Sequence, residues 1–190
     1  EPNAMATTPA LTPAPAPWSG RVDTTPEVRE IGPLRIPAGL FNVFLQEADE
    51  DSLQLQEGLA NWGRAPALVP PAELETLAHS LAGSSATVGF ASLSELARHM
   101  ESSLERLRAQ RLASGDDGAP AATRETAAQC AEDAALLAEA GEEMRQLLHQ
   151  FAAGFLRGPD PVLLERLRAQ ASRSAATTPL DIDLGSLMQE

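Results

Sequence analysis

The sequence predicts an all-α protein, an antiparallel up-and-down four-helix bundle with one extra short helix. Apolar residues recur at three- and four-residue spacings over most of the chain, whereas no segment shows a convincing two-residue strand alternation. Hydrophobic residues make up 43% of the chain, but aromatic residues only 4%. The core must therefore be built largely from leucine, alanine and valine, a composition that favours packed helices over sheets. Short connections between successive helices favour antiparallel packing.

The length of 190 residues predicts one domain with a tail at each end. Residues 1–30 are rich in proline, alanine and threonine and are expected to form a disordered linker, with the four residues before Met5 expected to be a tag remnant. Residues 173–190 are expected to form a second linker or tail. The helical bundle is predicted over residues 31–172, as a piece of a longer protein.

The first two helices are bounded by residues that stop or start helices. A helix over residues 39–62 follows Pro37 and is expected to end at Gly63. A second helix over residues 70–89 begins with two prolines, which a first helical turn tolerates, and ends at a glycine. The apolar spacing of the first helix predicts that it buries Leu40, Phe41, Phe44, Leu45, Ala48, Leu55 and Leu59.

Three more helices are predicted from the same periodicity. A helix over residues 91–111 has Ser92 or Ser94 as its expected N-cap. A long alanine-rich helix follows over residues 123–155, and a short one over residues 160–170. The apolar stripe of the long helix is expected to include Leu137, Met144, Leu147, Leu148, Phe151 and Phe155.

The charge of the chain excludes several classes of function. There are 14 basic residues, all of them arginine, against 27 acidic ones, for a formal net charge of −13. Such a surface repels phosphate backbones and anionic lipids, so nucleic-acid binding is not expected. No apolar run of about 18 residues predicts membrane insertion, and no leader indicates export. The single cysteine, Cys130, has no partner for a disulfide, and a cytoplasmic location fits best.

His79 lies on the outward side of the second predicted helix. A helical wheel places it about 160° from the centre of the apolar arc, on the same side as Gly83 and Ala86. A glycine inside a helix costs about 0.5 to 1 kcal/mol relative to alanine, and a surface position has no packing reason for it. The missing side chain would leave the imidazole open to a reactive group of another macromolecule, with the hydroxyls of Ser84 and Ser85 beside it. The apolar arc itself consists of Leu74, Leu77, Leu81, Ser85 and Val88.

Other candidate sites have less support. His99 and His149 have no glycine one turn further on and are predicted to be ordinary surface residues. No His-Glu-x-x-His spacing, phosphate-binding glycine loop or nucleophile elbow is present, so a metal-binding enzyme is the least favoured alternative. Paired acidic residues, such as Asp49 with Glu50 and Glu142 with Glu143, are expected to be solvated. A non-catalytic helical scaffold or interaction module of a larger sensor kinase remains open.

Residues 77–90 read LAHSLAGSSATVGF and precede a helix containing Leu93, Leu96, Ala97 and Glu101. This arrangement resembles the signature of histidine phosphotransfer (HPt) domains. The flanking segments IGPLRIPAGLFNVFLQEADE and MRQLLHQFAAGF further resemble HPt modules of the large chemotaxis-type hybrid histidine kinases that control type IV pilus motility. The resemblance implies that His79 accepts and donates a phosphoryl group. Its partner would be the aspartate of a response-regulator receiver, or the kinase catalytic domain of the parent protein.

The same resemblance implies that the chain has no ATP-binding kinase site and no cofactor of its own, with Mg²⁺ held by the receiver. Many HPt domains have a lysine three residues after the histidine, where Ala82 stands here. Positive charge for the phosphoryl oxygens would then come from a partner, from Arg98 or Arg64, or from no residue at all. Ala82, Ala86 and Phe90 are expected to form the docking surface for the receiver.

Overall fold

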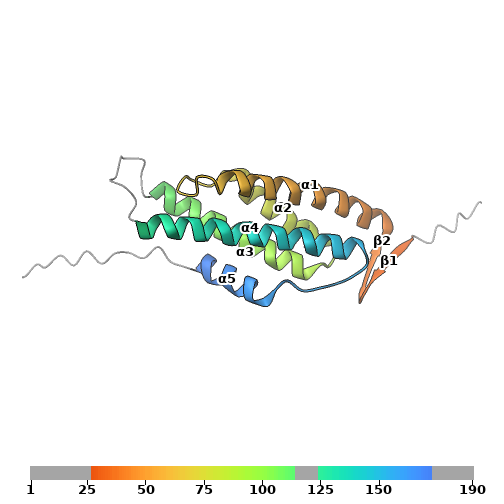
Figure 1. Ribbon diagram of the computed structural model, residues 1–190. Helices are drawn as coiled ribbons and strands as arrows, with labels where there is room; N and C mark the ends of the chain where they lie inside the picture. Colours follow the sequence, from red (N-terminus) through yellow and green to blue (C-terminus); the bar gives the residue numbers. More distant parts are fainter. Residues whose placement is uncertain (1–26, 114–123, 173–190) are drawn as a thin grey trace, which may run out of the picture.

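The computed structural model describes residues 27–113 and 124–172, which form the predicted helical bundle. Four long helices lie side by side and a fifth, short helix packs against the flank of the bundle (Figure 1). The fold class predicted from the sequence is confirmed. Most of the predicted linkers, residues 1–26 and 173–190, lie outside the described residues. The helices are α1 (Ala38–Trp62), α2 (Ala72–Thr87), α3 (Ala91–Ala113), α4 (Arg124–Ala152) and α5 (Pro161–Ser172).

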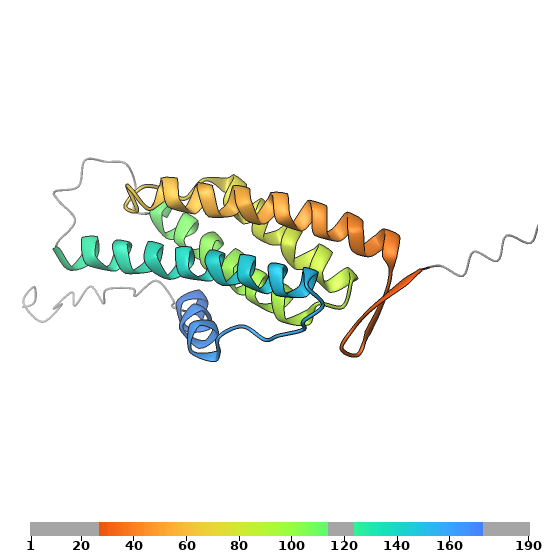
Figure 2. The ribbon, with the colours of Figure 1, turned by 45° about the vertical axis from the view of Figure 1, so that its right-hand side comes forward.

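Each long helix packs against two of the other long helices. Helix α1 lies between α2 and α4, and α3 lies between α2 and α4, while α5 covers α3 and α4 (Figure 2). Gly58 allows α1 and α2 to approach closely, because a Cβ atom there would lie 2.4 Å from Cδ2 of Leu74. Within the described ranges, every helix is too short or too polar to span a bilayer.

A short β-hairpin precedes α1 and corrects the prediction that the chain has no strand. Strands β1 (Val28–Ile31) and β2 (Leu34–Pro37) pair antiparallel, with Ile31 opposite Leu34. Four residues per strand give too few alternations to stand out in the sequence. The available signal was the turn, in which Gly32 and Pro33 connect two apolar ends. The hairpin buries Ile31 and Ile36 against the end of the bundle and overlaps the predicted linker over residues 1–30.

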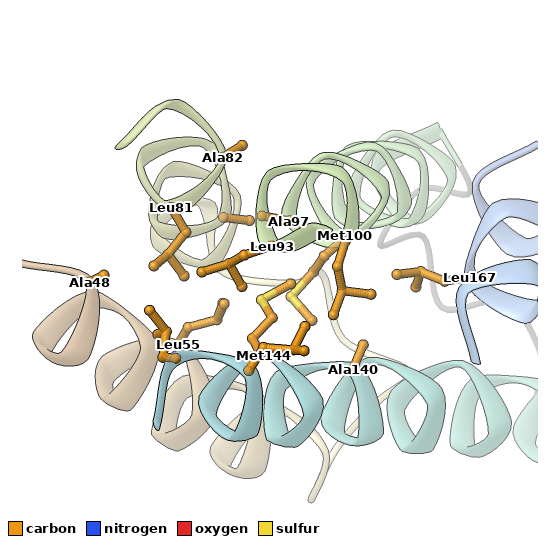
Figure 3. Packing of buried hydrophobic residues seen from close by; sticks show 14 of the residues in the cluster. Ala48, Leu55, Leu81, Ala82, Leu93, Ala97, Met100, Ala140, Met144 and Leu167 are labelled. Atoms are coloured by element: carbon orange, nitrogen blue, oxygen red, sulfur yellow. The ribbon is translucent and has the colours of Figure 1, made fainter. Parts of the chain in front are cut away.

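Aliphatic and methionine side chains from the facing helices meet inside the bundle (Figure 3). A cluster of phenylalanines lies in the same core. Phe151 of α4 contacts Phe41 and Phe44 of α1, with ring centroids 5.6 and 5.8 Å apart. Two residues assigned to apolar stripes are exposed instead: Leu40 by 39% and Phe155 by 62%. Phe41, one residue on from Leu40, faces the core as predicted. Helix α4 ends at Ala152, so the helical periodicity from which the burial of Phe155 was predicted does not extend to that residue.

Candidate functional site

Helices α2 and α3 are held together at the turn that joins them. Gly89 has a φ of 80°, a conformation that favours glycine and reverses the chain within three residues. Ser94 was a candidate N-cap, but it lies inside α3, which begins at Ala91. Its hydroxyl donates a hydrogen bond of 2.9 Å to the carbonyl oxygen of Ala82. This bond fixes the start of α3 against the middle of α2 and so sets which residues face each other across the two helices.

His79 is exposed on α2 and has one defined partner. Its side chain is 76% exposed, and its Nδ1 atom lies 2.8 Å from Oε1 of Glu101 on α3. An ionised carboxylate can only accept hydrogen bonds, so Nδ1 carries the proton and donates it to Glu101. The lone pair of the neutral ring then resides on Nε2, which has no hydrogen-bond partner in the described part of the chain. The prediction that His79 lies on the outward side of the helix is confirmed.

Sequence reasoning did not assign a role to Glu101. It is one of the residues that carry the family resemblance, but a contact between two helices cannot be found from the periodicity of either. The side chain is 28% exposed, which places it on the flank of α3 that faces α2. A partly shielded carboxylate that is hydrogen-bonded to a histidine ring fixes the orientation of the ring. Glu101 thus completes a His-carboxylate pair that leaves one ring nitrogen free to react.

The helical turn after His79 is open, as the sequence predicted. A Cβ atom built on Gly83 would have no heavy atom within 4 Å apart from its own helix and chain neighbours. The carbonyl oxygen of Gly83 accepts a hydrogen bond from Oγ1 of Thr87. No side chain of the described residues therefore requires a glycine at this position for packing. Its effect is to leave the approach to the imidazole unobstructed.

His79 lies at the edge of a surface depression of about 340 Å³ between α2 and α3. Arg98 lines this depression, whereas Arg64, the other arginine considered from the sequence, does not. We call it the His79 depression; its described lining residues are His79, Ala82, Gly83, Arg98, Glu101, Ser102 and Glu105. A second depression of about 450 Å³ adjoins it through Arg98 and is lined by Ala86, Gly89, Ala91, Ser94, Glu95, Arg98 and His99. Of the expected docking residues, Ala86 is exposed.

The structure corrects the expected exposure of Phe90 and Ala82 and the expected position of the Ser85 hydroxyl. Phe90 is fully buried and stacks on Phe151 with ring centroids 4.3 Å apart, so it cannot contact a partner. Ala82 is only 3% exposed and lies on the flank of α2 towards α3 (Figure 3). Ser85 is fully buried, as its place in the apolar arc predicted, so its hydroxyl is not beside the exposed imidazole. Ser84 is half-buried, and its hydroxyl bonds the carbonyl oxygen of Leu81 in its own helix.

His99 differs from the ordinary surface residue that the sequence predicted, whereas His149 is exposed as expected. His99 is half-buried, and its Nε2 atom accepts a hydrogen bond of 3.2 Å from Nε of Arg168 on α5. Burial lowers the pKa of His99 below its usual range, and the charge of Arg168 lowers this pKa further. His99 is therefore a packed, neutral residue whose Nε2 lone pair is already used.

The acidic pairs have partners within the protein. Asp49 lies 3.5 Å from Arg145, and Glu143 accepts a hydrogen bond from the backbone of Asp160. Beside the candidate site, Oγ of Ser80 donates a hydrogen bond of 2.6 Å to Asp51. In the described part of the chain, no three or more histidine, cysteine or acidic side chains are grouped so that they could hold a metal ion.

Comparison with known protein families identifies a match for this part of the chain. The family model of the Hpt domain matches residues 39–154, a span that begins in α1 and ends just after α4. It therefore includes both helices of the candidate site and the pair formed by His79 and Glu101. Among curated proteins, none matches the chain.

Proposed function

Because the chain belongs to the Hpt domain family, whose members carry phosphoryl groups on histidine in phosphorelays, we propose that His79 is the histidine that accepts and donates the group. The observation that carries the proposal is the arrangement of the ring: Nδ1 is held by Glu101, the side chain is 76% exposed, and Nε2 has no hydrogen-bond partner among the described residues. His99 and His149 lack this arrangement. The open turn at Gly83 supports the same assignment.

The proposed reaction is a direct transfer between two proteins. The lone pair on Nε2 of His79 attacks the phosphorus of an acyl phosphate on a receiver's aspartate. A nitrogen–phosphorus bond forms, the bond from phosphorus to the aspartyl oxygen breaks, and the aspartate leaves as a carboxylate. The ring becomes positively charged while Nδ1 keeps its proton, and the carboxylate of Glu101 stabilises that charge. Transfer in the other direction reverses each step.

The partner in this proposal is a response-regulator receiver, which also holds the Mg²⁺ that neutralises the acyl phosphate. The contribution of the chain is to present one oriented ring on a rigid helix. A chemotaxis-type hybrid histidine kinase is the proposed parent protein, and its catalytic domain is a second proposed phosphoryl donor. A cytoplasmic location, where these partners function, is part of the proposal.

The test is phosphoryl transfer from phosphorylated receivers encoded with the parent kinase. The chain should acquire an acid-labile, base-stable label, which is the behaviour of a phosphohistidine. His79→Gln should acquire none, whereas His99→Gln and His149→Gln should label normally. Label that persists in His79→Gln would place the phosphoryl group elsewhere. A wild-type chain that takes label from none of these receivers would favour the alternative of a non-catalytic scaffold.

A further inference from the structure

Arg98 lines the His79 depression together with His79 and has no bound partner among the residues that the structure describes. It is exposed on α3 and is the only arginine among the described residues that line the His79 depression. Across residues 27–113 and 124–172, it takes part in no hydrogen bond or ion pair. Its guanidinium group is therefore available to a ligand that enters the depression.

The carboxylates that would normally pair with Arg98 are occupied. Residues three apart on a helix are neighbours on its surface, so Glu95 and Glu101 are the natural partners on α3. Glu95 is instead bound by Arg168 of α5, and Glu101 by His79 of α2. Packing of α2 and α5 on opposite sides of α3 thus leaves an arginine unpaired next to the candidate nucleophile.

The His79 depression also has room for a phosphoryl group. Between His79 and Arg98, helix α2 contributes only the methyl group of Ala82 and the bare backbone of Gly83. The other charged residues that line it are Glu101 and Glu105, both acidic. A phosphoryl group on Nε2 would add further negative charge to this acidic surface. Stabilisation therefore requires a cation, and a guanidinium group matches phosphoryl oxygens with two parallel hydrogen bonds.

We propose that Arg98 binds the phosphoryl oxygens while the group moves to and from Nε2 of His79. It would supply from α3 the positive charge that a lysine at position 82 of α2 supplies in the related domains. The inference rests on the proposed function, since it concerns the same transfer. It assigns to this chain a phosphoryl-binding residue of its own, in addition to the charge that the receiver contributes.

The first experiment compares rates of transfer from a receiver that phosphorylates the wild-type chain. Arg98→Gln should be on the order of ten- to a hundredfold slower, the effect of losing a hydrogen bond to a charged group. Arg98→Lys should recover part of the rate. Ala82→Lys in the Arg98→Gln background should also recover part, because its side chain can extend into the His79 depression. Arg64→Gln, which removes an arginine from outside the depression, should transfer at the wild-type rate.

The second experiment needs no receiver. The chain is phosphorylated with phosphoramidate in a His99→Gln, His149→Gln background, which leaves His79 as the only histidine. The phosphorus NMR signal is then followed against pH, with thermal unfolding as the control for folding. A bound guanidinium favours the doubly charged phosphoryl group, so adding Arg98→Gln should move the titration to higher pH.

The outcomes separate the two proposals. A wild-type chain that accepts no label from any receiver contradicts the proposed function. A folded Arg98→Gln chain with an unchanged transfer rate and an unchanged phosphorus titration overturns the role of Arg98, and leaves the role of His79 intact. Loss of rate in Arg64→Gln of the same size as in Arg98→Gln would also overturn it, since a general effect of surface charge would then explain both.

Discussion

His79 and His99 lie on neighbouring helices, and the protein surrounds them in opposite ways. His79 is exposed and donates from Nδ1 to a carboxylate, so its second nitrogen is free. His99 is half-buried and accepts on Nε2 from Arg168, so its lone pair is used and a cation lies beside it. A nearby carboxylate stabilises the positive ring that forms during transfer, whereas a guanidinium group opposes it. Under the proposed function, the partner of each histidine, and not its presence on a helix, is expected to decide which one reacts.

The two histidines also differ in the residues that cover them. Four residues after His79 is Gly83, where even a Cβ atom would meet no neighbour. Four residues after His99 is Ser103, which is fully buried, and α5 packs over this part of α3. The side of α2 that carries His79 is therefore uncovered, whereas α5 packs on the side of α3 that carries His99. These differences can be tested one at a time, by closing the turn after His79, by removing the charge of Glu101 and by breaking the contact between His99 and α5.

Closing the open turn beside His79 should have the largest effect. Gly83→Leu places a branched side chain over the approach to Nε2, and transfer should fall on the order of a hundredfold or more, as misplacement of reacting groups by about 1 Å does. Folding should not suffer, because leucine is the better helix former and stability should rise by up to about 1 kcal/mol. Stopped-flow transfer rates and thermal unfolding measure the two effects.

Gly83→Ala is the matched control for this change. It gives a similar gain in helix stability but adds only a methyl group into open space, so it should retain most of the transfer rate. A folded Gly83→Leu chain that transfers as fast as the Gly83→Ala chain would mean that the glycine is not there for access.

Removing the charge of the carboxylate beside His79 should have the next largest effect. Glu101→Gln keeps a group that can accept from Nδ1, but it no longer stabilises a positive ring. Transfer should slow by about tenfold, since hydrogen bonds to charged groups are roughly twice as strong as neutral ones. Glu101→Ala also removes the acceptor, and nitrogen NMR of the ring should then show loss of the Nδ1–H form. If that form persists in Glu101→Ala, another group fixes the ring, and the His-carboxylate pair is not what distinguishes His79.

The sequence predicted the parts of this comparison that depend on one helix at a time. A repeating apolar stripe and glycine or proline boundaries located all five helices, and the wheel of α2 placed His79 and Gly83 outside. Contacts between helices could not be predicted in this way. The register of α2 against α3, which brings Glu101 to His79, depends on a turn of three residues and on the bond from Ser94 to Ala82.

The residues predicted wrongly show the same limit. Ala82 faces outward from the leucines of its own helix, but α3 covers that flank, which a wheel of α2 alone cannot show. Phe90 follows Gly89, whose positive φ turns the chain back and places the ring against Phe151. The hairpin before α1 was missed because its strands are shorter than the pattern that identifies strands.

The smallest effect is expected from releasing His99 from α5. Burial is the main cause of the lowered pKa of His99, and the charge of Arg168 is the second. Arg168→Gln removes only the second cause, and the ring stays half-buried near Glu95 and Arg98. The pKa should rise towards its usual range, as an NMR titration of the imidazole would show. In the wild type the folded pKa lies below the unfolded value of about 6.5. Unfolded chains therefore take up the proton first as the pH falls, and stability is lost below that pH. In Arg168→Gln, the free energy of unfolding should therefore decrease less as the pH falls.

The same variant should slow transfer by a few-fold, on the order of the weak pairing expected between surface charges three residues apart. Without Arg168, Glu95 becomes free to pair with Arg98 and to compete with the phosphoryl group for it. Adding Glu95→Gln removes the competitor, so the double variant should transfer at the wild-type rate while the pKa of His99 stays altered. A double variant as slow as Arg168→Gln would show that α5 influences His79 by a route other than the pairing of Glu95 with Arg98. The surroundings of His99 and of His79 would then be coupled through α3, although no contact between them indicates it.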